Sequence, residues 1–492
     1  MTTRAGHLVR PPNDRDGARR NRRVLSSLAS PITSASAALL RIRGTASVRR
    51  PALIGRVGEP ATVDYRGTIK RSVALLLGLI AFAGACTSAP NEAGSESETP
   101  SDSDSQAEQP GIDAVPADPL AALPGKLAIL DQSVLIVTNP NGSGARIIDG
   151  GGTSAALQPI WSPDGQTLAW VSLREADILV SQQEIEGDTR SDTSIGTTLP
   201  IYMQWNAAGD MLAYMRPNPF GPELEVGTVI PGEAPVAVEV ASPFFISFAP
   251  EDNSLLGHID DQRLALWNNG PTIDLGPTDG SFTAPAWLDQ NRVLVHLDDA
   301  LTIIDLRDGT ETEIADVGRS TEFVASPSGE LVAFLDGPPE LLTIQQREVA
   351  TSTLRVIEVD TGLELIVTDA PVAAFEWSPD GSKLAWLEVP DGPAVGGARW
   401  HYWAGGEVAV SPEYFPSELM AQEYLPFFAQ FAQSHTAWAA NGEAFAFAGS
   451  IDGEAGVWVQ LMDPTADPVL VGFGSMVIWS RDGAVTAGVS PA

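Results

Sequence analysis

The sequence predicts an all-β protein built from repeated units, and three observations lead to this fold class. The chain has 46 glycines and 38 prolines among 492 residues, more than a helical protein tolerates, because both residues interrupt helices. A short phrase recurs at intervals typical of a four-stranded unit. Continuous apolar runs follow its copies, as expected for strands covered on both faces.

The phrase Trp161-Ser-Pro-Asp-Gly165 returns unchanged as Trp377-Ser-Pro-Asp-Gly381, and six weaker copies keep its frame. These copies start at Trp205, Phe248, Trp287, Ala325, Trp438 and Trp479, and consecutive starts are 38 to 61 residues apart. The aromatic residue ends an inner strand and can pack between neighbouring units. Pro and Gly set the turn angles, and Asp bonds to the turn backbone. This period predicts a β-propeller of four-stranded blades.

The two ends of the repeat region are incomplete in complementary ways. Residues 126–149 contain three strand-like runs without a phrase of their own, and the chain after Trp479 has room for only one or two strands. We therefore expect a propeller over residues 125–492 with eight blades, closed by pairing of the N- and C-terminal strands. Seven blades are the alternative if Phe248 or Ala325 does not start a blade.

The recurring turn phrase resembles that of the TolB-like and WD40-like propeller repeat families. The resemblance extends over about residues 126–492, three quarters of the chain. It implies the propeller fold because the copies stay in register. It implies no single function, since propellers serve as scaffolds, peptidase gates, quinoprotein dehydrogenases and hydrolases.

Charge is divided unevenly along the chain. Residues 1–71 hold 15 of the 29 cations and four of the 63 acids, which leaves 14 cations, 59 acids and a net charge of −45 for the rest. Such a body repels phosphate backbones, so we expect no nucleic-acid partner. The same charge favours a soluble monomer.

Residues 70–85 have the pattern of an export signal. Lys70-Arg71 precedes fourteen uncharged residues, fewer than the roughly 20 that a membrane-spanning helix needs. Ala83-Gly84-Ala85-Cys86 resembles the lipobox of bacterial lipoproteins, which usually has Leu in place of Ala83. The resemblance implies cleavage before Cys86, lipidation of its thiol and anchoring at the outer face of a bacterial membrane. The alternative is an uncleaved signal anchor.

Two segments flank this signal without the composition of a folded domain. Residues 1–69 are rich in Arg and lack apolar periodicity, and we interpret them as a disordered leader or the product of a misassigned start. A basic tail that touches anionic lipid or RNA is the alternative. Residues 86–124 contain the lipidated Cys86 and eight acids with no cation, which predicts a disordered tether.

An aromatic-rich insertion is the candidate binding patch. Nine aromatic side chains fall within residues 400–431, and residues 417–433 have the pattern of a short helix capped by Ser417. One interpretation is a pocket or docking patch, and the other is a helix that covers the propeller and buries its apolar stripe. The candidate residues are Trp400, His401, Tyr402, Trp403, Tyr424, Phe427, Phe428, Phe431 and His435.

Signals for catalysis are weak. The chain has no Gly-x-Ser-x-Gly elbow, and its Asp pairs lack the ligand spacing of a calcium loop. We expect no catalytic residue, cofactor or metal, and interpret the protein as a lipid-anchored envelope module that binds a protein or envelope ligand. The alternative is a propeller enzyme (a hydrolase, lyase or quinoprotein) that uses channel carboxylates and His258, His296, His401 or His435.

Overall fold

The computed structural model describes residues 118–481 with short gaps. The gaps are at 176, 188, 222, 242–243, 260–262, 269–271, 278–282, 318–320, 345–346, 391–396 and 404–407. The expected leader, signal segment, Cys86 and most of the tether lie outside the described residues. Within the described part of the chain, no helix is long and apolar enough to cross a membrane.

Antiparallel β-sheet dominates the structure, and five of the sheets consist of four consecutive strands. Their strands are β4 (Ser154–Trp161), β5 (Thr167–Arg174), β6 (Asp177–Glu184) and β7 (Arg190–Gly196); β8 (Tyr202–Trp205), β9 (Leu212–Pro217), β10 (Leu224–Val229) and β11 (Val236–Ala241); β12 (Phe244–Phe248), β13 (Leu255–Ile259), β14 (Arg263–Trp267) and β15 (Ile273–Pro277); β16 (Ala286–Trp287), β17 (Arg292–Leu297), β18 (Ala300–Asp305) and β19 (Thr310–Asp316); β27 (Phe415–Pro416), β28 (Ala444–Ile451), β29 (Glu454–Leu461) and β30 (Val469–Gly472).

A seven-stranded sheet contains two further four-stranded units that share a strand. It is formed by β20 (Phe323–Ala325), β21 (Leu331–Ile344), β22 (Arg347–Glu358), β23 (Glu364–Trp377), β24 (Leu384–Glu388), β25 (Arg399–Trp403) and β26 (Val408–Val410). The first part of β23 pairs mainly with β22, and residues 372–377 pair with β24. The long interval before the second perfect phrase is thus filled by extended strands.

The remaining sheet joins the two ends of the repeat region. It contains β1 (Leu127–Asp131), β2 (Val134–Thr138), β3 (Arg146–Asp149) and β31 (Met476–Trp479), in the order β3-β2-β1-β31. Leu127 lies opposite Trp479 in the antiparallel register. The Lys126 amide donates to Ser480 Oγ at 2.8 Å, and the Ser480 amide donates to the Lys126 carbonyl at 2.9 Å. The expected partners of residues 126–149 therefore come from the last strand.

The two perfect copies of the phrase fold into the same turn. Asp164 accepts the Gln166 amide at 3.0 Å, and Asp380 accepts the Ser382 amide at 3.0 Å. The glycine after each aspartate has a positive φ, +70° at Gly165 and +71° at Gly381, which a side chain would disfavour. The expected roles of Asp and Gly in the turn are confirmed.

Four of the tryptophans that start the phrase link their unit to the one before it. The indole N–H of each donates to the carbonyl of the residue just before the preceding start. These bonds are Trp205 to Ile160 at 3.5 Å, Trp287 to Ser247 at 3.1 Å, Trp377 to Val324 at 3.1 Å and Trp438 to Glu376 at 3.3 Å. A residue type that recurs in the sequence thus makes a recurring contact between neighbouring sheets.

A buried carboxylate joins the first two sheets. Asp149, at the end of β3, accepts the Trp170 indole N–H at 2.7 Å, the Ser172 hydroxyl at 2.6 Å and the Arg190 guanidinium at 3.0 Å. Burial raises the pKa of Asp149, but the hydrogen bonds from Ser172 and Trp170 outweigh it and hold the pKa below its usual value. The carboxylate stays ionised and connects β3 to β5 and β7.

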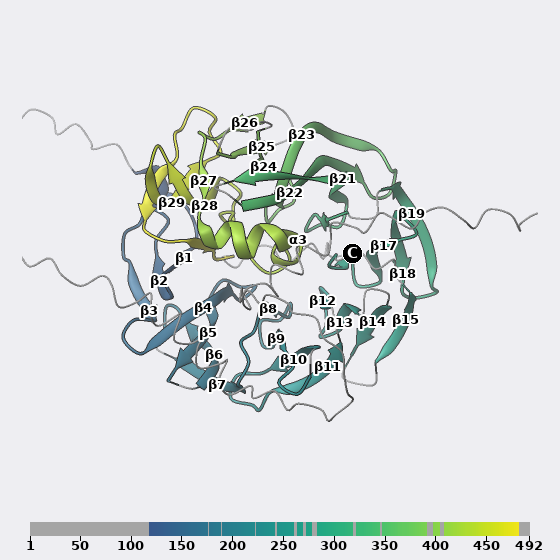
Figure 1. Cartoon of the computed structure of the whole chain (residues 1–492), viewed down its shortest axis with the longest axis horizontal. Coiled ribbons are helices and arrows are strands. Elements are labelled where there is room, and N and C mark those ends of the chain that lie inside the picture. The colour runs from purple at the N-terminus through teal and green to yellow at the C-terminus, as the bar shows by residue number, and fades with distance from the viewer. Residues whose placement is uncertain are drawn as a thin grey trace, which may run out of the picture. The chain divides into compact units, whose positions relative to one another are not determined.

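The first strands of the sheets lie next to one another. β31 contacts β4, β4 contacts β8, and the contacts continue through β12 and β16 to β20. Figure 1 shows the sheets following one another around a centre, with a helical segment across it. Successive four-stranded sheets with their first strands at the centre are the arrangement of a β-propeller.

Candidate functional site

Half of the aromatic cluster belongs to a sheet. β25 lies between β24 and β26, and its side chains alternate between the two faces of the sheet. Trp400 and Tyr402 are buried against Phe445 on β28, with ring centroids 4.7 and 5.6 Å apart. Trp403 lies on the opposite face and is partly buried. These rings therefore mainly join β25 to the following sheet.

His401 shares the second face of β25 with Trp403. Its ring stacks on Trp386 at 5.3 Å, and its Nε2 lies 3.1 Å from a carboxylate oxygen of Glu388. Burial lowers the pKa of His401, and Glu388 partly opposes this effect. The described residues contain no group of three or more His, Cys, Asp or Glu side chains able to hold a metal ion.

The other half of the cluster forms the helical insertion. It consists of a π-helical segment η3 (Met420–Tyr424), a 3₁₀ segment η4 (Leu425–Phe427) and α3 (Phe428–Phe431). The Ser417 hydroxyl accepts the Met420 amide at 3.1 Å, so the expected cap is confirmed. Pro426 has no N–H to donate, which accounts for the irregular hydrogen bonding in the middle of the insertion.

The apolar stripe of the insertion faces the inner strands. Tyr424, Phe428 and Phe431 are buried, whereas Phe427 is half-buried. The ring of Phe428 meets Phe375 on β23 edge-on with centroids 4.9 Å apart. These contacts place the stripe in the main hydrophobic core.

Polar bonds fix the insertion to three more places around the centre. The Gln430 side chain accepts a hydrogen bond from the Ile246 amide at 3.0 Å and donates one to the Ile246 carbonyl at 2.9 Å. Its side-chain amide therefore bonds to both backbone groups of one residue on β12. The Tyr202 hydroxyl on β8 donates to the Gln430 carbonyl at 3.1 Å. Gln433 donates to the Pro285 carbonyl beside β16 at 3.1 Å. The insertion is thus held by β8, β12, β23 and the start of β16.

Ionisable groups lie buried near the insertion. Glu376 on β23 accepts the Ala437 amide at 2.8 Å, and burial raises the pKa of Glu376 to about 7. His435 lies 2.7 Å from the Ser434 hydroxyl through Nδ1, and burial lowers the pKa of His435 to about 3. Arg481, just after β31, interacts electrostatically with both. A carboxyl that titrates near neutral pH is suited to proton transfer.

The remaining candidate histidines occupy a different place. His258 on β13 and His296 on β17 are buried and line a cavity of about 10 Å³ together with Pro285 and Phe323. A cavity of this size holds at most about one water molecule. It offers no room for a substrate.

Sequence reasoning missed Glu376 and Arg481, although both break the repeat. The residue before each phrase is in order Ile160, Gln204, Ser247, Ala286, Val324, Glu376, Ala437 and Ile478, and only one of these eight is charged. Arg481 stands where both perfect copies have proline. Comparison of equivalent positions between copies is the signal that would have found both residues.

Comparison with known proteins gives structural neighbours only. No family model matches the chain, and no curated protein matches it. Among solved structures, a eukaryotic initiation factor is 9% identical with a TM-score of 0.46, covering 73% of this chain and 99% of that chain. TolB from Acinetobacter baumannii is 13% identical with a TM-score of 0.33, covering 73% and 69%. The propeller domain of the Trilobed protease from Pyrococcus furiosus is 12% identical with a TM-score of 0.37, covering 66% and 85%.

Proposed function

We propose that this chain is an exported lipoprotein whose propeller acts as a binding module for a protein or another component of the bacterial envelope. In this proposal Cys86 carries the lipid, residues 87–117 form the tether, and the propeller binds through its loops and its insertion. The last residues of the expected tether belong to the body, because η2 (Pro119–Ala122) is a 3₁₀ helix with Leu120 buried in the core. The acidic body disfavours nucleic acid as the partner.

The proposal includes eight blades in a closed ring. Support comes from six four-stranded sheets and a seven-stranded sheet that divides into two units at β23. The pairing of β1 with β31 gives the first unit its inner strand from the far end of the chain. A ring closed in this way leaves only short, protected sheet edges.

The observation that carries the binding function is the buried stripe of the insertion. Tyr424, Phe428 and Phe431 fill the space over the inner strands, and Gln430 bonds to β12. A centre filled by aromatic side chains suits a rigid binding surface better than an open catalytic channel. Phe427 remains half-buried on the insertion and is a point of contact for a partner.

A central-channel enzyme is the second candidate, because Glu376 and His435 are both buried within electrostatic range of Arg481. Catalysis at this place requires the insertion to move, since the buried Tyr424 of its stripe lies within electrostatic range of Glu376. Turnover that is lost in Glu376→Gln and retained in a variant of His401 would favour the enzyme.

A cross-linking experiment tests the binding function. A photoreactive residue is placed at position 427 of the full chain in a bacterial host, with position 220 as the control because Phe220 is 95% exposed on another loop. We expect one discrete cross-linked product from position 427 and none from position 220. Equal products from both positions, or none from 427, would contradict the proposal.

Anchoring is tested separately by the intact mass of the membrane-extracted protein. We expect a chain that begins at Cys86 and carries acyl groups, and we expect Cys86→Ser to leave the membrane fraction. A mass that retains residues 1–85 would overturn the anchor without affecting the binding test.

A further inference from the structure

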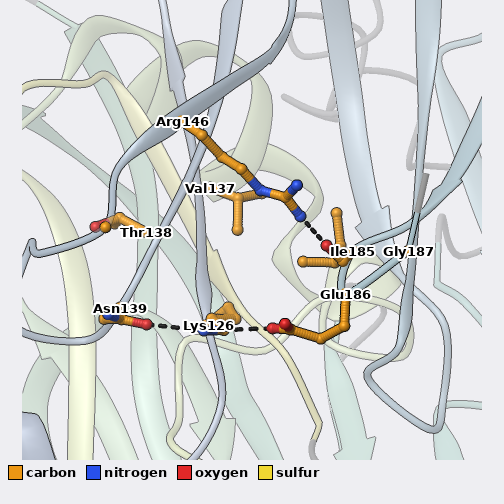
Figure 2. Close-up of a pocket in the computed structure, with 9 residues that line it drawn as sticks. Lys126, Val137, Thr138, Asn139, Arg146, Ile185, Glu186 and Gly187 are labelled. Carbon is orange, nitrogen blue, oxygen red and sulfur yellow. Dashed lines mark hydrogen bonds and ion pairs between the residues drawn. The ribbon is translucent and has the colours of Figure 1, made fainter.

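A polar cavity lies between the first two sheets, away from the insertion. It is partly open to solvent and has a volume of about 220 Å³, and Arg146 on its wall is exposed. It is lined by Lys126 just before β1, the end of β2, the start of β3 and the turn between β6 and β7. Figure 2 shows Lys126, Asn139 and Arg146 on one side and Ile185 and Glu186 on the other. The cavity has room for several waters or a small polar group.

Cations are scarce in this body, and two of them line this cavity. Residues 72–492 contain 14 cations against 59 acids. Two cations that face one cavity therefore create a local positive potential on a protein whose overall potential is negative. Most described arginines pair with carboxylates, as Arg216 does with Glu225 at 2.5 Å. Among the described residues, Arg146 has no carboxylate within ion-pair distance.

The donors of both cations remain partly unused. The Arg146 guanidinium donates to the Ile185 carbonyl, and its planar fork has five N–H groups in all. The Lys126 ammonium donates to the Asn139 side-chain oxygen at 2.8 Å and lies 3.4 Å from Glu186. A planar fork beside a point charge is an arrangement that recognises oxyanions.

Glu186 is the only acidic side chain lining the cavity within the described residues. Its side chain is 83% exposed, so its pairing with Lys126 is weak and can be exchanged for another anion. Removal of this carboxylate should therefore strengthen the binding of an anion, whereas removal of either cation should weaken it. These opposite changes in anion affinity distinguish a binding site from a pair of structural contacts.

We propose that this cavity binds a singly charged phosphate group, carried by a small soluble molecule or a lipid headgroup. A single charge fits best because the net charge of −45 repels a more highly charged ligand. Asn141, in the adjoining turn, donates to Asp118 at 2.8 Å, so the cavity lies beside the point where the chain enters the body. The proposal is independent of the partner of the insertion and of the lipid on Cys86.

The soluble arm of the test uses inorganic phosphate at mildly acidic pH, where the singly charged H₂PO₄⁻ predominates, and the full chain in a nonionic detergent. Backbone amide exchange over residues 139–146 is measured in phosphate and in chloride at equal ionic strength. We expect protection that saturates with phosphate. Its apparent Kd should rise by about tenfold or more in Lys126→Met and Arg146→Gln, and should fall about two- to fivefold in Glu186→Gln.

The other lysine of the body provides matched controls. Lys383 pairs with Glu443 at 3.7 Å and is likewise partly exposed, but both lie far along the sequence from the cavity-lining residues. Lys383→Met and Glu443→Gln should leave the phosphate response unchanged. Tighter binding in Glu186→Gln cannot arise from loss of folding, so the test does not depend on the two weakened variants alone.

A lipid arm separates the two sources of the phosphate. The full chain is reconstituted in phosphatidylcholine vesicles with or without phosphatidylglycerol, and the same amides are followed. Protection that needs phosphatidylglycerol and Lys126 supports a headgroup, whereas protection by inorganic phosphate alone supports a soluble ligand. No protection in either arm, or equal loss in Lys383→Met, would overturn the proposal.

Discussion

Two buried carboxyl groups in this protein have opposite electrostatic surroundings. Asp149, between the first two sheets, has donors from Trp170, Ser172 and Arg190, and its pKa lies below the usual value. Glu376, near the insertion, is more deeply buried, and burial raises its pKa to about 7 despite a hydrogen bond from the Ala437 amide. Glu376 also has a hydrogen bond from the Thr436 side chain, so its deeper burial, together with the larger number of donors around Asp149, decides the direction of each pKa shift.

The difference shows which buried charge holds the fold together and which can respond to pH. A saturated carboxylate is ionised at every physiological pH and acts as a fixed link between sheets. A carboxyl with too few donors exchanges its proton near neutrality, which is useful to a catalyst or a sensor but reduces stability when it ionises. Asp149 therefore has a structural role, whereas Glu376 is the buried carboxyl whose charge can change with pH near neutrality.

The largest expected effect follows from removal of the Asp149 carboxylate. Asp149→Ala leaves the Trp170 and Ser172 donors and the Arg190 charge without their buried partner. We expect a loss of about 3–5 kcal/mol in the free energy of unfolding, measured by urea denaturation. Asp149→Asn, which keeps an acceptor, should lose less.

Asp360→Ala is the matched control for this first prediction. Asp360 also pairs with an arginine, Arg292, at 3.4 Å, but its side chain is 82% exposed. We expect no measurable change in stability, because water replaces the lost contact. Equal losses in Asp149→Ala and Asp360→Ala would show that burial and donor number do not set the energetic cost of losing a carboxylate.

The second prediction concerns the pH dependence of stability. The pKa of Glu376 is raised from 4.5 to about 7, so the folded state binds a proton that the unfolded state releases, and stability falls as the pH rises through this range. Glu376→Gln should remove this fall and be more stable than the wild type at pH 8 by about 3 kcal/mol. The lowered pKa of His435 acts in the opposite direction, so only the difference between the two proteins reports on Glu376.

Urea denaturation of both proteins between pH 4 and 8 measures this difference. The two stabilities should be closest at the acid end and should diverge toward neutral pH. A constant difference over the whole range would mean that Glu376 ionises at its usual pKa. It would contradict the conclusion that burial raises the pKa of this group.

Much of the fold could be predicted because the turn chemistry is local. The residues Trp161-Ser-Pro-Asp-Gly165 predict a turn without any information from the rest of the chain, and the spacing of the copies predicts the period of the sheets. The pairing of β1 with β31 also followed, because each end of the repeat region lacked the strands that the other supplies. Local signals repeated in register carry information about long-range pairing.

The candidate site could be predicted only in part. The sequence indicated the aromatic cluster, but Trp400 and Phe428 look the same in a sequence whether they face a partner or the core, and the structure buries both. The cavity at Lys126 and Arg146 depends on two turns that lie 39 residues or more apart, so no local pattern signals it. Burial and convergence are properties of the packed chain.

The smallest expected effect tests the donors of Asp149 one at a time. Ser172→Ala removes a hydroxyl that donates to the buried carboxylate at 2.6 Å, and we expect a loss of about 2 kcal/mol at pH 7. The pKa of Asp149 should rise at the same time, because one of the hydrogen bonds that lower it is gone. Ser172→Ala should therefore lose less stability than the wild type when the pH falls below 3.8, because the Asp149 pKa is then closer to its unfolded value.

Ser181→Ala provides the comparison within the same sheet. The Ser181 hydroxyl is also buried and donates at 2.6 Å, but its acceptor Asp192 keeps contact with water. We expect a smaller loss than for Ser172→Ala, since water and Arg174 satisfy the Asp192 carboxylate after the hydroxyl is removed. Equal losses would mean that the lost hydroxyl alone sets the cost, and that the desolvation of Asp149 adds nothing to it.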